Sequence, residues 1–151
     1  MSFLADGKRL IILDQRYDHH YDFLQKELDM DVAKLFFLCL LLGYKAGRKK
    51  EDYKAGRKQF RTSYLSEEQR AIMYTIGEEI CDYQLFKNFT DQEVIMKIIK
   101  DYQLYSSGGM EILLEEVFSS QLTNGQLNPV YKNYDYDLLC YLYDKLEAAP
   151  F

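Results

Sequence analysis

The chain has 151 residues, of which 48% are hydrophobic, with eight glycines, two prolines and three cysteines. The apolar content excludes a disordered chain, and the glycine, proline and cysteine contents exclude collagen-like and disulfide-scaffold classes. We expect a single helical domain over residues 1–151, because the length suits one domain. The formal net charge of −5 argues against a general nucleic-acid coating protein.

The first predicted elements lead into the most apolar part of the chain. Leu10–Leu13 is a short β-prone run, which predicts a lone strand or an extended arm. Tyr17–Leu28 carries apolar residues at helical spacing. Asp31 is placed to cap a helix over Val32–Leu42 that is apolar on all sides, and such a helix belongs in the centre of a core. Its apolar run is far shorter than the roughly 20 residues of a membrane-spanning helix.

Two capping-box patterns predict the next helices. Ser66 with Gln69, and Thr90 with Glu93, have the spacing in which side chain and backbone cap each other. Apolar residues follow each box at helical spacing, up to Tyr83 and Tyr102 respectively.

The last third of the chain predicts two further helices. Ser107–Gly109 is expected to open one of them, and Asn124–Gly125 predicts a turn. A final helix spans about Asp135 to Leu146, with five residues expected to face inward: Leu138, Leu139, Tyr141, Leu142 and Leu146. Together the elements predict an all-α, compact bundle of five to six helices around the central apolar helix, with one short N-terminal strand as an option.

The charge is concentrated in one segment, residues 45–61, which we call the basic strip and expect to be an arm or loop. It holds eight basic residues and only two acids, Glu51 and Asp52, in an otherwise acidic chain. A Tyr-Lys-Ala-Gly-Arg-Lys sequence occurs twice here, over Tyr44–Lys49 and Tyr53–Lys58, and a tandem duplication accounts for it. The eight residues are Lys45, Arg48, Lys49, Lys50, Lys54, Arg57, Lys58 and Arg61.

The basic strip is the strongest candidate for binding, and nucleic acid is its predicted partner. Lysine and arginine attract phosphate and release counterions, and Tyr44, Tyr53, Phe60 and Tyr64 lie between the charges as stacking residues do on unpaired bases. Two alternatives stay open: a solvated loop, or a strip that docks on an acidic surface of its own chain or of a partner.

No pattern in the sequence predicts catalysis, a cofactor or a metal. Asp14, Asp18 and Asp22 have helical ligand spacing near His19 and His20, but adjacent histidines point apart, and a solvated helix face is the favoured interpretation. Ser106–Gly109 precedes a predicted helix and suits an anion, although a capping turn is favoured. The only two histidines are neighbours, so no base, nucleophile and orienting acid come together. We therefore expect a chain that is not an enzyme.

Tyrosine is the other unusual feature. The chain has 14 tyrosines and no tryptophan, and tyrosine is enriched at protein interfaces. We expect a protein partner or a homo-oligomer through a tyrosine-rich surface around Tyr131–Tyr143. Cys39, Cys81 and Cys140 have no metal or redox spacing. Together with a start that lacks signal-peptide features, this predicts a cytoplasmic protein.

Two segments resemble a known family. Leu35–Arg48 resembles the "apolar helix, then Gly-Tyr-Lys-x-Gly-Arg" signature, and Tyr102–Leu114 resembles the later "Tyr-Ala-x-Gly-Gly-x-x-x-Leu" segment, of a small helical family. That family accompanies bacterial DNA phosphorothioation (Dnd) modification and restriction gene clusters. The duplicated repeat and Ser106 depart from the family's pattern.

The resemblance implies an accessory role in DNA modification or phage defence, without a catalytic residue. The predicted function is thus a non-catalytic accessory protein that binds nucleic acid weakly through the basic strip and acts in a larger complex. The alternative is a protein–protein interaction or oligomeric adaptor domain that binds no nucleic acid.

Overall fold

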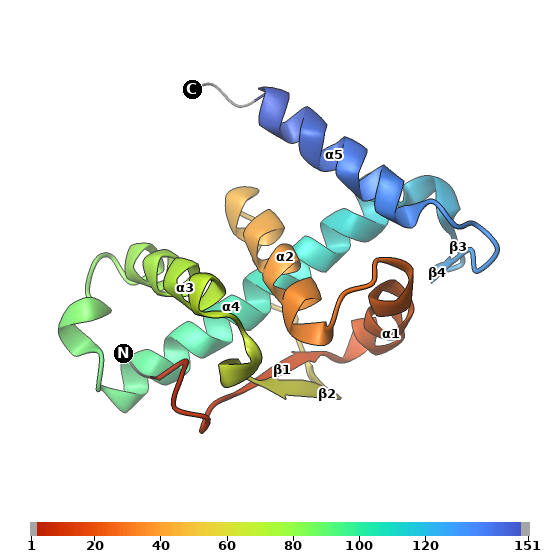
Figure 1. The fold of residues 1–151 in the computed structure, drawn as a ribbon. Coiled ribbons are helices and arrows are strands. Elements are labelled where there is room, and N and C mark those ends of the chain that lie inside the picture. Colours follow the sequence, from red (N-terminus) through yellow and green to blue (C-terminus); the bar gives the residue numbers. More distant parts are fainter. Residues whose placement is uncertain (1–2, 149–151) are drawn as a thin grey trace.

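The computed structural model describes residues 3–148 and is mostly helical, with 62% of its residues in helices. Two small antiparallel sheets accompany the helices, so the all-α prediction is correct only for the dominant structure (Figure 1). Five α-helices lie in the described part of the chain, in agreement with the predicted five to six. They are α1 (Asp18–Glu27), α2 (Val32–Lys45), α3 (Glu67–Ile80), α4 (Gln92–Ile112) and α5 (Tyr134–Ala148).

The larger sheet joins the N-terminal strand to the second half of the basic strip. β1 (Leu10–Asp14) runs antiparallel to β2 (Ala55–Arg61), with Ile11 opposite Phe60. The predicted N-terminal strand is therefore confirmed, and residues 55–61 of the basic strip, expected as an arm or loop, form the second strand of this sheet. Only Phe60 is buried in β2, so the apolar alternation that would have indicated a strand is missing.

The predicted central helix is confirmed as α2. Asp31 accepts a hydrogen bond from the backbone nitrogen of Lys34 and so caps its N-terminus. Leu35, Phe36 and Leu40 are fully buried. They belong to one apolar cluster that also draws residues from α1, α3, α4 and both strands of the larger sheet.

α2 packs most extensively against α4, and glycines allow their backbones to meet. A Cβ atom added to Gly109 would lie 1.7 Å from the carbonyl oxygen of Cys39, and one added to Gly43 would lie 1.9 Å from that of Tyr105. Any larger side chain at these two positions would push the helices apart. The two helices cross in Figure 1.

The prediction that Ser107–Gly109 opens a new helix is wrong, because α4 is continuous from Gln92 to Ile112. Ser106 to Gly109 are buried within the helix, and the Ser106 hydroxyl donates to the carbonyl of Phe36 across 3.3 Å. The close packing on α2 offsets the low helix propensity of these small residues. One π-helical turn, Leu113–Val117, then ends this helical segment.

A short hairpin precedes α5. β3 (Leu122–Thr123) pairs with β4 (Gln126–Leu127), and the predicted Asn124–Gly125 turn lies between them, with φ of 52° and 77°. These positive φ values suit asparagine and glycine in a tight hairpin turn.

α5 is anchored at its start and projects from the rest of the molecule (Figure 1). Tyr134 is fully buried, with edge-on ring contacts to Phe118 and Phe23, and Leu138 is also buried. The inward orientation predicted for Leu139 and Leu146 is wrong, because both are exposed. Within residues 3–148, no helix combines the length and apolarity needed to cross a bilayer.

Candidate interaction surfaces

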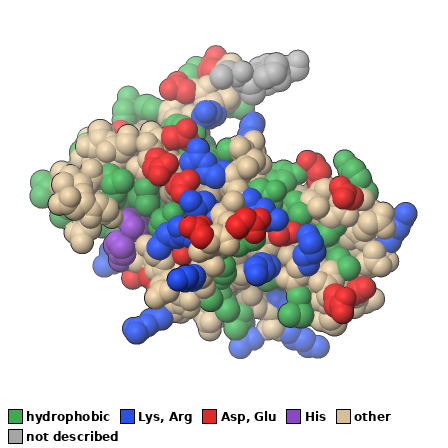
Figure 2. All heavy atoms as spheres, turned by 180° about the vertical axis from the view of Figure 1, so that it is seen from behind, with side chains coloured by type: hydrophobic (Ala, Val, Ile, Leu, Met, Phe, Trp, Pro, Cys, Tyr) green, Lys and Arg blue, Asp and Glu red, His purple; other side chains and the backbone are tan. Residues whose placement is uncertain are grey.

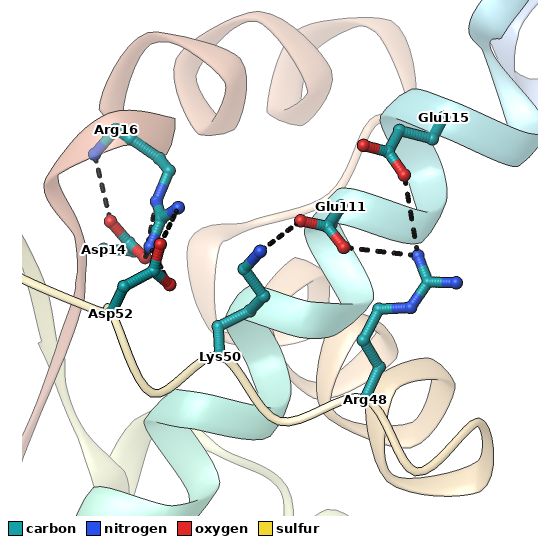
Figure 3. Close-up of polar contacts among 7 residues, drawn as sticks. All are labelled: Asp14, Arg16, Arg48, Lys50, Asp52, Glu111 and Glu115. Atoms are coloured by element: carbon teal, nitrogen blue, oxygen red, sulfur yellow. Dashed lines mark hydrogen bonds and ion pairs between the residues drawn. The ribbon is translucent and has the colours of Figure 1, made fainter.

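The first half of the basic strip runs along α4 and its π-helical turn. The Arg48 guanidinium lies 3.4 Å from a carboxylate oxygen of Glu111 and 3.7 Å from one of Glu115. Lys50 forms an ion pair with Glu111, and its backbone nitrogen donates to the carbonyl of Leu104 across 3.1 Å. Figure 3 shows both cations pointing at carboxylates of this helix.

Lys49 is paired with a buried carboxylate. Its ammonium lies 2.9 Å from Asp101, whose side chain is 6% exposed and also contacts Lys97 at 3.0 Å. The hydrogen bond with Asp101 raises the pKa of Lys49. Lys49 also lies over the ring of Tyr105. This lysine therefore compensates a buried charge in α4.

The basic strip also makes polar contacts with the rest of the protein around Asp52 and in β2. Asp52 pairs with Arg16 at 2.9 Å, and Arg16 also contacts Asp14 at 3.0 Å (Figure 3). In β2, Lys58 forms an ion pair with Asp22 of α1, and Arg61 donates to the carbonyl of Gly7 across 2.6 Å. Within residues 3–148, four of the eight cations are ion-paired: Arg48, Lys49, Lys50 and Lys58.

Three cations of the strip keep their side chains exposed. Lys45, Lys54 and Arg57 form no ion pair and no side-chain hydrogen bond within the described residues. On the face shown in Figure 2, basic and acidic side chains alternate and no continuous basic surface forms. Nucleic-acid binding by the strip stays a prediction, and these three residues are its freest members.

Most of the aromatic residues interleaved with the strip are used inside the protein. Tyr53 donates its hydroxyl to the carbonyl of Ile12 across 2.6 Å. Phe60 is buried against Phe36. Tyr44 packs edge-on against the ring of Tyr105 and donates to Glu79. Tyr64, by contrast, is exposed and is available to a partner.

The residues considered for a metal lie in structural contacts. Asp14 binds Arg16, Asp22 binds Lys58, and the buried His20 has its Nε2 atom 2.8 Å from the carbonyl oxygen of Gly125. Burial lowers the pKa of His20. Asp18 accepts a hydrogen bond from the backbone nitrogen of Arg57 at 3.4 Å. The His19 and His20 rings are in contact, with centroids 4.0 Å apart and planes tilted by 38°. Among the described residues, no three metal-ligating side chains are grouped to hold an ion.

A cationic groove lies beside β1, and sequence reasoning missed it. Lys8, Arg9 and Lys100 line a volume of about 510 Å³, together with Tyr53 and Met96, and none of its lining residues is acidic. Its residues come from three separate parts of the chain, so no local charge cluster indicated it.

The outer face of α5 exposes several large apolar side chains. Tyr136, Leu139, Tyr143 and Leu146 are 65%, 65%, 62% and 64% exposed. They surround a shallow hollow together with Cys140, which is also exposed. The four positions repeat at three- and four-residue spacing, so they form one stripe along the helix.

A second apolar hollow lies between α5 and the C-terminal half of α2. Leu38, Leu41 and Leu42 of α2 face Leu142 and Leu146 of α5 across a groove of about 510 Å³. Figure 2 shows an opening through the molecule beneath the projecting segment at the top of the view. The polar side chains at this groove are Lys45, Arg48, Glu116, Tyr141 and Lys145.

Comparisons with protein-family models, curated proteins and solved structures give no match for this chain. The resemblance to the phosphorothioation-associated family therefore stays a prediction. The structure gives the glycines of the two resembling segments a packing role, because Gly43 and Gly109 permit the crossing of α2 and α4.

Proposed function

We propose that this chain is a non-catalytic protein-interaction module whose docking element is α5 with its adjoining groove. One observation carries the proposal: four large apolar side chains of α5 are more than 60% exposed on one face. Contiguous apolar surface of this kind is the usual mark of an interaction site. Two of the four residues are tyrosines, which are favoured in interface cores.

Among the residues that the structure describes, the fold does not bury this face. α5 is attached through Tyr134 and Leu138, which are buried, and through Tyr141, whose hydroxyl donates to Glu116 across 3.3 Å. Burial of apolar area contributes about 25 cal/mol per Å². Covering these exposed side chains would therefore stabilise a complex with a partner. The groove beside α2 extends this apolar surface.

Substitution on α5 tests the proposal, because highly exposed residues change without loss of the fold. The test variant is Leu139→Lys with Leu146→Lys, and its matched control is Ile72→Lys with Phe86→Lys, two exposed apolar residues that line neither hollow beside α5. We expect the wild type and the control to associate, with themselves or with an identified partner, and the α5 variant to lose that association.

Light scattering measures self-association, and affinity capture from the source cells with mass spectrometry measures partner binding. Circular dichroism confirms that each variant is folded. An α5 variant that associates as the wild type does would overturn the proposal, as would a wild type that associates with nothing in either measurement.

Nucleic-acid binding is a second candidate, and the cationic groove favours it. Lys8, Arg9 and Lys100 line this groove without an acidic residue, and Lys54 lies between its lining residues Tyr53 and Ala55 in the chain. The proposed setting is the accessory role in DNA modification or phage defence that the family resemblance implies. This second candidate function rests on the family resemblance and on the positive charge of the cationic groove.

A filter-binding titration at two salt concentrations tests the second candidate. Each neutralised phosphate of duplex DNA contributes about −0.9 to the slope of log K against log salt. Three to four contacts therefore give a slope of roughly −3 to −4. Lys8→Ala with Lys100→Ala should lower this slope by about 2. The absence of retention at low salt would exclude the candidate.

A further inference from the structure

The two hollows beside α5 share residues. Leu142 and Leu146 line both the hollow on the outer face of α5 and the groove between α5 and α2. An apolar surface therefore passes from the outer face, around the C-terminal half of α5, into the groove. One occupant that lies along this half of α5 covers both.

Charges around the groove indicate how such an occupant is oriented. Lys45 and Lys145 stand at the groove, both near the C-terminal ends of their helices, and they form no ion pair within residues 3–148. Arg48 is also there, already held by Glu111 and Glu115. The groove thus favours an apolar helix that brings acidic residues to this end. Glu116, the one acid among the described residues of the groove, accepts a hydrogen bond from Tyr141.

α5 itself has these properties. Its first turn carries Asp135 and Asp137. Its C-terminal end carries Lys145 on the side of the groove, and Asp144 on the side of the outer hollow, with Glu147 following. Two copies of α5 that pack antiparallel would place the first turn of each beside the C-terminal end of the other. On the side of the groove, the first-turn acids would then approach Lys145 and Lys45 of the second copy. The two helix dipoles would oppose each other favourably.

The size of the surface also favours a second copy over a short peptide. A stable interface buries about 800 Å² on each partner, and the exposed stripe of α5 is one face of a 15-residue helix. A reciprocal contact uses the stripe and the groove of both chains at once. It doubles the buried surface by symmetry, as isologous dimers do.

We infer that the groove between α2 and α5 is filled by α5 of a second copy of this chain, in an antiparallel and reciprocal pair. This inference rests on the proposed function and names its partner. The mass in solution is then that of a dimer. Leu139→Lys with Leu146→Lys halves that mass, whereas Ile72→Lys with Phe86→Lys leaves it unchanged.

Cys140 reports the antiparallel arrangement directly. It is exposed and lies close to the middle of α5, so an antiparallel pair places it near its own counterpart. A short bis-maleimide reagent should link two chains through this residue at protein concentrations where free chains do not react together. Cys140→Ser should abolish the linked product, and Cys81→Ser, the matched control at the C-terminal end of α3, should preserve it.

The outcomes separate this inference from the proposed function. A dimer that depends on Leu139 and Leu146 and links through Cys140 supports the inference. A wild type that is monomeric at all concentrations overturns it, and so does a dimer that the α5 variant leaves intact. If that monomer captures an identified protein and the α5 variant does not, the proposed function stands and only the second copy is wrong.

Discussion

α2 and α5 are both rich in leucine and aromatic residues, yet only α2 is buried. α2 lies in the central apolar cluster and is locked to α4 by glycine contacts. α5 is of similar length, but it buries little beyond Tyr134 and Leu138 and exposes a full stripe to solvent. An apolar pattern therefore establishes that a segment forms a helix, whereas its neighbours in space decide whether the apolar face belongs to the core or to a partner.

The largest expected effect is at the crossing of α2 and α4. Gly109→Val places a side chain where a Cβ atom would already lie 1.7 Å from the carbonyl oxygen of Cys39. Overpacking costs about 1–3 kcal/mol where side chains can adjust, and here a backbone would have to move. We expect loss of the cooperative thermal transition. Lys100→Ala, an exposed position on the same helix, should melt like the wild type, and a similar melt for Gly109→Val would refute the close crossing.

A leucine-to-alanine substitution in α2 and another in α5 compare how much each helix contributes to the stability of the core. Leu40 of α2 is fully buried, so Leu40→Ala should cost about 2–5 kcal/mol of unfolding free energy. Leu139 of α5 is 65% exposed, so Leu139→Ala should stay within about 0.5 kcal/mol for the isolated chain. Urea denaturation at low protein concentration measures both. Equal losses would mean that α5 is part of the core.

The next effect separates the two kinds of cation in the basic strip. Arg48, Lys49 and Lys50 are ion-paired, whereas Lys45, Lys54 and Arg57 have no ion pair within residues 3–148. Alanine at the first three should cost on the order of 1–3 kcal/mol, chiefly because Asp101 is left buried with one partner fewer. Alanine at Lys45, Lys54 and Arg57 removes the same amount of positive charge. This variant should lose less than about 0.5 kcal/mol of unfolding free energy. Urea denaturation of the two triple variants checks this, and equal stability would show that the ion pairs contribute nothing.

Local signals in the sequence predicted much of the helical part of the fold. The capping box at Ser66 and Gln69 is formed with both of its hydrogen bonds, and the Asp31 cap and the Asn124–Gly125 turn are confirmed. At the second box the prediction is off by one residue, because Asp91 caps α4 instead of Thr90. Short polar side chains cap whichever backbone nitrogens they reach, so neighbouring candidates compete.

What the sequence did not predict depends on contacts between distant segments. β2 shows no apolar alternation and exists because it pairs with β1. The sequence predicts that Ser107–Gly109 opens a helix, whereas Gly108 and Gly109 lie within α4 and contact the strip and α2. Nothing local to Lys49 indicated that Asp101 would neutralise it. The basic strip was evident as charge, but its pairing required the fold.

The smallest expected effect occurs only at mildly acidic pH. It concerns the hydrogen bond between His20 of α1 and Gly125 of the hairpin that precedes α5. Burial lowers the pKa of His20 below its ordinary 6.5, so the unfolded chain takes up this proton at a higher pH than the folded chain does. The stability that neutral His20 contributes is complete above pH 6.5 and is lost as the pH falls from there through the lowered pKa. His20→Gln, which keeps a donor for the Gly125 carbonyl, should remove this part of the pH dependence in melts between pH 7 and about pH 5. His19→Gln, one residue away, should keep it, and an unchanged pH dependence in His20→Gln would show that the buried imidazole is not the titrating group.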